Sequence, residues 1–280
     1  MPKIAVLQMT SGIDPEANFQ AIEKALKEAQ SAGADVLFTP EMSLLLDRNR
    51  TRAAETMASP DYLEIRARLN DLAMSGHTDL ALGSMPVPLE GGKNANRSVY
   101  FHSDGEQAAQ YDKIHMFDVD LASGESWRES NAYEPGKFVV TEPDTPLGTM
   151  GLTVCYDLRF PALFDALGKA RCDVIAVPAA FTKPTGEAHW HILLRARAIE
   201  ASAFVIAAAQ VGKHEDGRET YGHSLVVDPW GEVLLDMGGK EAGLGFCDID
   251  LARIAEVRGQ IPSLANRREM PKSGWDNRMG

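Results

Sequence analysis

Three residues of this chain supply a nucleophile, a base and a cation at points where apolar runs end. Glu41 closely follows the apolar run 36–38, Lys113 follows a second run, and Cys155 ends a third. Side chains at the ends of buried strands reach a crevice, which makes these three candidates for a reactive site. A thiol needs a base to receive its proton, and a carboxylate accompanied by a lysine can serve. The trio indicates nucleophilic catalysis by cysteine.

The setting of Cys155 leaves two interpretations open. A helix is predicted from about residue 158 to 170, with Asp157 as its N-cap and Pro161 in its first turn. The free amides and the dipole of a helix N-terminus favour a thiolate, although Asp157 opposes it unless that carboxylate caps the helix or pairs with an arginine. The alternative is an inert core thiol, since free cysteine is often buried. Cys172 and Cys247 lack such a setting, and packing explains them better.

The seven histidines offer no clear partner for the candidate nucleophile. His115 and His223 could approach a cleft, but no spacing pairs either with the cysteine. His189 and His191 resemble a metal-binding pair, yet side chains two residues apart on a helix point in different directions. No metal site is therefore predicted, and a carboxylate remains the preferred base.

Alternating strands and helices must position these residues. Short apolar runs predict strands, and segments of helical periodicity predict helices. Their order predicts the α/β fold class, with a mixed sheet system covered by helices. The predicted strands are 4–9, 35–38, 79–83, 150–155, 173–177 and 203–210, the predicted helices are 15–33, 60–75, 158–170 and 187–202, and hairpins join 98–102 to 107–111 and 223–228 to 232–236.

A short pattern occurs twice along the chain. Asp35 begins a strand with a proline five residues later at Pro40, and Asp173 begins a strand followed in the same way by Pro178. The recurrence favours two similar halves, and chance is the alternative for so short a pattern. No Ser/Gly/Pro-rich linker separates the halves, so residues 1–280 are predicted to form a single domain.

Composition excludes several classes of protein. The 40 acidic and 28 basic residues give a net charge of -12, which argues against nucleic acid or an anionic membrane as a partner. The apolar run at the N-terminus is too short for a signal peptide or a membrane span. An odd number of cysteines, three, argues against a disulfide framework. A cytoplasmic protein with reduced thiols is predicted.

Three sequence blocks around these residues resemble the nitrilase, or carbon-nitrogen hydrolase, superfamily. They are FTPEM at 38–42, YDKIHMFD at 111–118 and GLTVCYDLRFP at 151–161, followed by TGEAHW at 185–190 and YGHS at 221–224. The order and the spacing match, and the blocks extend over nearly the whole chain. The resemblance implies a four-layer αββα sandwich with two pseudo-symmetric halves. It also implies a homodimer or a higher homo-oligomer formed through the helical face, and the tail 261–280 is a candidate for that interface.

The resemblance also implies the role of each site residue. Cys155 is the expected nucleophile that attacks an amide, Glu41 the general base, and Lys113 the cation beside the oxyanion. The backbone amide of Tyr156 is a second expected oxyanion donor. Glu129, in WRES at 127–130, lies where the family places a glutamate that supports the lysine; a solvated loop charge is the alternative. No metal or organic cofactor is expected.

Further motifs resemble the Nit branch of this superfamily, which implies deaminated glutathione as the small-molecule amide substrate. They are LLRARAIE at 193–200, AAAQV at 207–211 and VVDPWG at 226–231. An omega-amidase acting on 2-oxoglutaramate or 2-oxosuccinamate is the close alternative. These substrates are anionic, so the pocket needs a cation, and Arg159 is the first choice, with a structural salt bridge as its alternative. Phe181 is expected to form a wall, Thr185 to donate a hydrogen bond, and the segment 114–137 to cover part of the pocket.

Other classes of function remain open. The chain could be a catalytically silent binding or scaffold relative, but the intact set of glutamate, lysine and cysteine argues against this. A thiol redox protein is disfavoured by the lack of a Cys-x-x-Cys motif. Acyl transfer, with an amine in place of water, remains possible. Nucleotide binding is not supported, because residues 91–94 lack the spacing of a phosphate loop.

Overall fold

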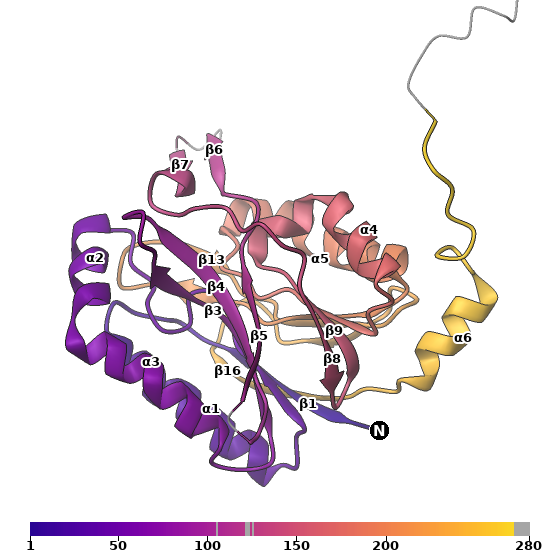
Figure 1. Ribbon diagram of the computed structural model, residues 1–280, viewed down its shortest axis with the longest axis horizontal. Coiled ribbons are helices and arrows are strands. Elements are labelled where there is room, and N and C mark those ends of the chain that lie inside the picture. Colours follow the sequence, from indigo (N-terminus) through magenta and orange to yellow (C-terminus); the bar gives the residue numbers. More distant parts are fainter. Residues whose placement is uncertain (105, 121–123, 125, 272–280) are drawn as a thin grey trace, which may run out of the picture.

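The computed structural model, which describes residues 1–104, 106–120, 124 and 126–271, contains two six-stranded β-sheets (Figure 1). In the first sheet, the three central strands are parallel and the outer strands are antiparallel to their neighbours. Its order is β16 (Gly243–Asp248), β1 (Lys3–Gln8), β2 (Val36–Phe38), β3 (Asp79–Pro88), β4 (Asn94–Phe101) and β5 (Gln107–Asp112).

The second sheet repeats this arrangement strand for strand. One antiparallel strand flanks three parallel strands, which are followed by two antiparallel strands. The order is β8 (Thr141–Thr145), β9 (Gly148–Leu152), β10 (Val174–Ala176), β11 (Phe204–Ala207), β14 (Leu225–Val227) and β15 (Val233–Asp236). The predicted pseudo-symmetric halves are therefore confirmed.

Asp35 and Asp173, the aspartates of the repeated pattern, have the same structural role in the two halves. Asp35 precedes β2, and its carboxylate accepts a hydrogen bond from the backbone N–H of Lys3 at 2.8 Å. Asp173 precedes β10 and accepts from the N–H of Thr149 at 3.1 Å. Each carboxylate thus joins the start of a central strand to the parallel strand beside it, which explains the repeated pattern in the sequence.

Helices cover the outer faces of both sheets (Figure 1). Helix α1 buries one apolar side that includes Phe19, Ile22 and Leu26, and Asp14 caps its N-terminus. The helices on the first sheet are α1 (Pro15–Ser31), α2 (Arg50–Ala58) and α3 (Pro60–Ala73), and those on the second are α4 (Pro161–Lys169) and α5 (Lys183–Ala201). Helix α6 (Ala252–Gln260) follows β16 at the far end of the chain. The α/β sandwich predicted from the sequence is confirmed.

The two sheets approach closely where β3 passes the turns after β2 and β10. A Cβ on Gly83 would lie 1.9 Å from the carbonyl oxygen of Thr39 and 2.5 Å from Pro178. Only glycine permits this approach, which brings the ends of β2 and β10 together. Among the described residues, no helix is long and apolar enough to cross a membrane.

The predicted helix after Cys155 begins later than expected. Residues Cys155–Arg159 form a 3₁₀ helix, and α4 starts only at Pro161. Proline lacks an N–H and restricts the residue before it to an extended conformation, here Phe160 with φ -110° and ψ 94°. The expected helix N-terminus at Asp157 is thus wrong, and Cys155 opens a short 3₁₀ turn. The Gly105 of the predicted hairpin turn lies outside the described residues.

Candidate active site

Glu41, Lys113 and Cys155 meet in one buried cluster. Glu41 lies in the turn after β2, Lys113 directly after β5, and Cys155 shortly after β9. Their exposed fractions are only 4%, 2% and 7%. β2 and β5 belong to the first sheet and β9 to the second, so residues that follow strands of both sheets form the cluster.

Two carboxylates hold the ammonium group of Lys113. Its Nζ lies 2.9 Å from Oε1 of Glu41 and 2.9 Å from Oε2 of Glu129. Asn96 in β4 donates from Nδ2 to Glu41 at 2.8 Å and to Glu129 at 3.2 Å. Sequence reasoning missed Asn96, for which the only signal is a buried polar side chain in a strand. Glu129 also accepts from the backbone N–H of Phe117 at 2.6 Å.

The electrostatics of the cluster favour a thiol beside a carboxylate. Burial alone would raise the pKa of Glu41, but the Lys113 ammonium and hydrogen bonds from Cys155, Lys113 and Asn96 hold it below its ordinary value. Burial raises the pKa of the Cys155 thiol well above its usual range, and the Glu41 carboxylate raises it further. Burial opposes the charge on Lys113, but Glu129 and Glu41 raise its pKa well above the ordinary value. The thiolate expected at a helix N-terminus is therefore not the resting form.

The backbone at Cys155 adopts an unusual conformation. Its φ of 49° lies in the left-handed region that non-glycine residues rarely occupy, and its N–H donates to the carbonyl of Pro178 at 2.8 Å. Tyr156 is the second residue of the 3₁₀ turn. The first N–H groups of a helical turn have no carbonyl partner within that turn, so this backbone amide can donate elsewhere.

Asp157 stabilises the turn that carries Cys155. It is fully buried, and its Oδ2 accepts from the Tyr111 hydroxyl at 2.7 Å and from the N–H of Val154 at 2.9 Å. Its Oδ1 accepts from the backbone N–H of His115 at 3.0 Å and lies 2.7 Å from Nδ1 of that ring. Asp157 thus ties the turn to the loop after Lys113, and its lone pairs are occupied by these partners.

A cavity of about 270 Å³ opens onto Cys155. Its lining includes Glu41, Lys113 and Glu129 at the cluster, and Phe117, Tyr156, Phe181 and Thr185 along the walls. Arg48, Trp127 and Arg218 also line it. Of the predicted substrate-binding residues, Phe181 and Thr185 therefore face the cavity. Phe117 and Trp127 come from the segment 114–137, whose residues 121–123 and 125 lie outside the described part.

Arg159, the predicted cation for the substrate, lies beside the cavity. It does not belong to the cavity lining. Its guanidinium carbon lies 5.2 Å from the centre of the Phe181 ring, and its Nη1 lies 3.2 Å from Nδ1 of His189. The 3₁₀ turn carries residue 159 towards α5 instead of into the cavity. Arg48 and Arg218 are cations of the cavity that sequence reasoning missed. Both lie in loops distant in sequence from Cys155, and no motif around them indicates a site.

One group outside the cavity has the composition of a metal site. His191 and His223 lie with Asp236 so that their ligand atoms are within 4.8 Å of one another. Hydrogen bonds already account for these contacts, since Asp236 lies 3.1 Å from Nε2 of His191 and 2.8 Å from Nδ1 of His223. The ring of His189 points away from that of His191 and contacts Arg159, as the spacing of these two histidines on a helix predicts.

Known proteins resemble the chain over nearly its whole length. The family model described as Carbon-nitrogen hydrolase matches residues 3–259. A protein of Yersinia enterocolitica named deaminated glutathione amidase is 41% identical over 271 residues, which cover 95% of this chain and 92% of the relative. The crystal structure of the Caenorhabditis elegans NitFhit protein is 36% identical with a TM-score of 0.89, and the match covers 95% of this chain and 65% of that one.

A mutant of the amidase from Nesterenkonia sp. AN1 has the same fold, with a TM-score of 0.80 and 25% identity over 95% of this chain and 94% of that one. Its active-site cysteine carries a covalently added acetamide moiety. The family match over most of the sequence decides the classification. This chain belongs to the carbon-nitrogen hydrolase family, within the nitrilase superfamily, and is a hydrolytic amidase.

Proposed function

We propose that the chain hydrolyses the omega amide of a small 2-oxo acid, with deaminated glutathione as substrate, through a thioester on Cys155. The observation that carries the proposal is the buried Cys155 thiol, the Glu41 carboxylate and the Lys113 ammonium at one cavity, with the ammonium 2.9 Å from that carboxylate. The reaction needs a proton acceptor, a nucleophile and a cation, and Glu41, Cys155 and Lys113 supply them.

In the first half of the reaction, Glu41 takes the thiol proton while Sγ of Cys155 attacks the amide carbonyl. The Lys113 ammonium and the N–H of Tyr156 stabilise the oxyanion that forms. Protonated Glu41 then gives its proton to the leaving nitrogen, and the C–N bond breaks. An amine or ammonia departs and a thioester remains.

In the second half, Glu41 takes a proton from water, which attacks the thioester. Collapse of the second oxyanion breaks the C–S bond, the proton returns to sulfur, and the free acid leaves. Glu129 acts as a positioning residue in both halves, because its two oxygens lie 2.9 and 3.1 Å from Nζ of Lys113 and keep that group in place. This cycle draws on protein side chains and water alone.

The substrate assignment follows relatives named deaminated glutathione amidase. Deaminated glutathione is a 2-oxo acid joined through its omega carbonyl to cysteinylglycine. Phe181 supplies an apolar wall, and Thr185 supplies a hydroxyl held 2.8 Å from Oγ1 of Thr182. An omega-amidase is the second candidate, because 2-oxoglutaramate has the same acyl part and releases ammonia.

The decisive test compares kcat/KM for deaminated glutathione and 2-oxoglutaramate. A higher value for deaminated glutathione is expected, and a clear preference for 2-oxoglutaramate would reassign the substrate. Loss of all turnover in Cys155→Ser is expected with either substrate, whereas full activity in that variant would refute the mechanism. Absence of turnover by the wild-type protein on any omega amide would support a silent binding relative. Product formation only when an amine acceptor is added would indicate acyl transfer.

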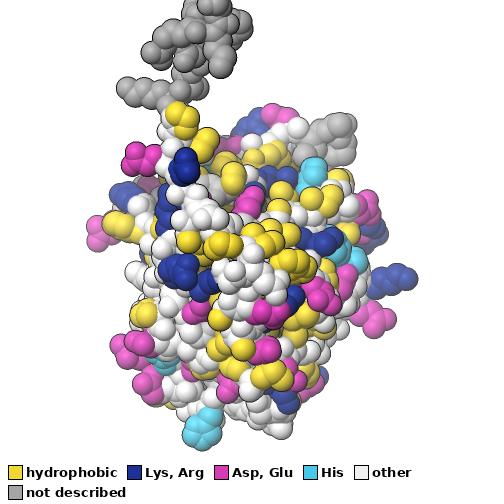
Figure 2. Space-filling model, turned by 90° about the vertical axis from the view of Figure 1, so that its right-hand side faces the viewer, with side chains coloured by type: hydrophobic (Ala, Val, Ile, Leu, Met, Phe, Trp, Pro, Cys, Tyr) yellow, Lys and Arg dark blue, Asp and Glu magenta, His cyan; other side chains and the backbone are white. Residues whose placement is uncertain are grey.

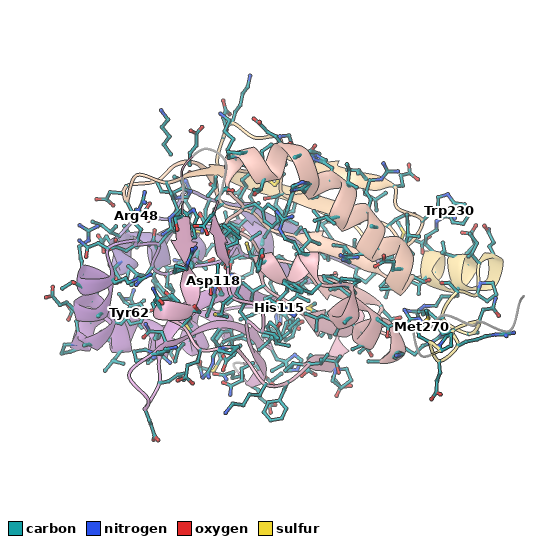
Figure 3. The ribbon with its side chains drawn as sticks, turned by 90° about the horizontal axis from the view of Figure 1, so that it is seen from above. Arg48, Tyr62, His115, Asp118, Trp230 and Met270 are labelled. Carbon is teal, nitrogen blue, oxygen red and sulfur yellow. The ribbon has the colours of Figure 1, made fainter. Side chains whose placement is uncertain are left out.

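A homodimer is part of the proposal. Three large apolar side chains on or beside α5 are exposed, with exposed fractions of 70% for Ile192, 50% for Ile199 and 44% for Trp230. Gly231, next to Trp230, packs against Ile199. Figure 3 places Trp230 at the end of the molecule that carries α6, and Figure 2 shows hydrophobic side chains gathered among charged ones on that end. Sedimentation equilibrium should show a dimer for the wild type and a monomer for Ile199→Asp.

The C-terminal tail contributes to this interface in the proposal. Its described part begins beyond α6, and Arg267 ties it to α4 by donating to the carbonyl of Asp165 at 2.9 Å. Residues 272–280 lie outside the described part of the chain. A cytoplasmic location is also proposed, since the three cysteines are free; subcellular fractionation tests it.

A further inference from the structure

Two arginines at the cavity have no part in the amide chemistry. Arg48 lies in the loop between β2 and α2, and Arg218 directly precedes β13 (Glu219–Tyr221). Their guanidinium carbons lie 5.4 and 5.2 Å from the centre of the same ring, that of Trp127 in β7 (Ser126–Arg128). Figure 3 shows Arg48 at the same end of the molecule as Asp118, which belongs to β6 (Asp118–Asp120), the hairpin partner of β7. The two cations and the indole ring therefore form one cluster on the cavity lining.

The buried carboxylate of Asp216 holds both arginines in place through hydrogen bonds. Oδ2 of Asp216 accepts from the backbone N–H of Arg48 at 2.9 Å and from Nε of Arg218 at 2.7 Å, and its side chain is fully buried. Over the described ranges, neither Nη of Arg218 nor any guanidinium nitrogen of Arg48 has a hydrogen-bond partner. A guanidinium has five N–H donors, so both groups keep donors for a ligand.

Several other charged groups around the opening already have partners in the protein. Arg50 donates to the carbonyl of Arg128 at 2.9 Å, and Arg128 pairs with Asp120 at 2.8 Å. Asp47 is paired with Arg52 at 2.6 Å. Asp216 engages Arg218 only through Nε, so the Nη groups of Arg218 keep their donors, and Arg48 has no carboxylate partner among the described residues. Both arginines therefore add positive charge to this part of the cavity, in a chain whose net charge is -12.

An aromatic wall links the nucleophile to these arginines. The ring of Tyr156, next to Cys155, lies 5.1 Å from that of Phe117, and the ring of Phe117 lies 6.2 Å from that of Trp127. An extended dipeptide spans roughly 7 Å at about 3.5 Å per residue. A two-residue leaving group that starts at the scissile nitrogen would therefore extend along this wall in the direction of the arginines.

We propose that Arg48 and Arg218 bind the terminal carboxylate of a peptide-like leaving group and thereby select such substrates over amides that release ammonia. The inference rests on the proposed hydrolysis at Cys155 and deepens it. Guanidinium groups bind carboxylates through paired, charge-assisted hydrogen bonds. Trp127 lies within cation–π distance of both guanidinium groups, which favours their position at the cavity lining.

The kinetic test uses three substrates. These are deaminated glutathione, the same compound with its terminal carboxylate converted to a carboxamide, and 2-oxoglutaramate. For Arg218→Gln and Arg48→Gln, kcat/KM for deaminated glutathione should fall by about tenfold to a hundredfold, chiefly through KM, because a charge-assisted hydrogen bond contributes about 1.5 to 3 kcal/mol. The carboxamide and 2-oxoglutaramate should react with both variants at close to wild-type efficiency.

Arg68→Gln is the control for the lost charge, since Arg68 lies on α3 and pairs with Glu16 away from the cavity. Equal losses on all three substrates, or no loss on deaminated glutathione, would overturn the carboxylate assignment while leaving the hydrolase proposal intact. If Arg218→Gln fails to fold because Asp216 loses its partner, Arg48→Gln decides, because its guanidinium makes no hydrogen bond in the described structure.

A binding measurement separates the two proposals. Calorimetric titration of deaminated glutathione into Cys155→Ala, with and without Arg218→Gln, reports recognition without turnover. Affinity that depends on Arg218, with no hydrolysis by the wild type, would support the carboxylate site and refute the hydrolysis. Hydrolysis by the wild type with affinity that is independent of both arginines would do the reverse. If the compound neither binds nor reacts, both proposals fail.

Discussion

Replacement of Glu41 by glutamine removes the proposed base while it keeps the shape of the side chain. Oε1 accepts from Nζ of Lys113 at 2.9 Å and from Nδ2 of Asn96 at 2.8 Å, and Oε2 accepts from the N–H of Ala180 at 2.9 Å. All three partners are donors, whereas a glutamine amide offers only one oxygen. Whichever way the amide turns, its NH₂ group faces a donor. The substitution therefore disturbs both the proton transfer and the hydrogen bonding.

The size of each effect can be estimated. A general base contributes about 10² to 10⁴ in rate, which corresponds to about 3 to 5 kcal/mol. We expect kcat of Glu41→Gln to fall by that factor. Breaking a buried ion pair costs about 3 to 5 kcal/mol, but Lys113 keeps Glu129 at 2.9 Å. The free energy of unfolding should therefore fall by about 1 to 3 kcal/mol, the cost of leaving one buried polar group unsatisfied.

The assay is mass spectrometry of the variant mixed with deaminated glutathione, followed by peptide mapping. Because hydrolysis of the thioester needs the same base, an acyl adduct on Cys155 should accumulate. Glu142→Gln is the matched control, since Glu142 is a buried carboxylate of β8 whose oxygen accepts from the N–H of Asp144 and which does not line the cavity. A wild-type rate for Glu41→Gln, or an adduct only on Cys172 or Cys247, would refute the reasoning.

Four further outcomes are expected. Glu129→Gln should lower kcat by about tenfold or more, because the oxyanion cation loses a carboxylate that holds it; a normal kcat with a raised KM would contradict a positioning role. The pKa of Glu41 is lowered and that of Cys155 is raised, so a kcat/KM profile should stay flat through neutral pH and fall only as acid protonates Glu41; a fall that begins near pH 7 would argue for a histidine base. Folded stability carried by Glu41 should likewise be lost as pH falls through its lowered pKa, seen in acid melting curves. Gly83→Ala should destabilise by about 1 to 3 kcal/mol or more in chemical denaturation, because its Cβ would lie 1.9 Å from the carbonyl oxygen of Thr39 after β2 of the same sheet and 2.5 Å from Pro178 after β10 of the second sheet; unchanged stability would refute these close contacts.

The fold was readable from the sequence because its signals are local. Strand and helix patterns and proline at helix starts each act within a few residues and indicate the α/β class. The repeated Asp and Pro positions favoured two similar halves, and the four-layer sandwich was implied by the family resemblance. The same holds for the candidate site residues at strand ends. Glu41, Lys113 and Cys155 each stand at a strand end, where a change of residue type marks the exit from a buried layer.

The hydrogen bonds that position these residues could not be predicted from the sequence, because they join segments that are distant along the chain. Asn96 reads as an ordinary polar residue of a strand, yet it bridges Glu41 and Glu129. Asp157 reads as a helix cap, yet its partners include Tyr111 and His115 from another part of the chain. Hydrogen bonds between distant residues produce no periodic pattern in the sequence.

The sequence by itself determined the α/β class, the family resemblance and the three residues expected to carry the chemistry. Only the tertiary structure decided where the proton rests and which cations face the cavity. The proton stays on sulfur because burial and the Glu41 carboxylate together outweigh the Lys113 ammonium. Arg159 is near Cys155 in sequence but turns towards α5, whereas Arg48 and Arg218 reach the cavity through loops ordered by Asp216. The direction of a side chain after a turn is set by backbone angles and long-range packing, which a linear sequence does not display.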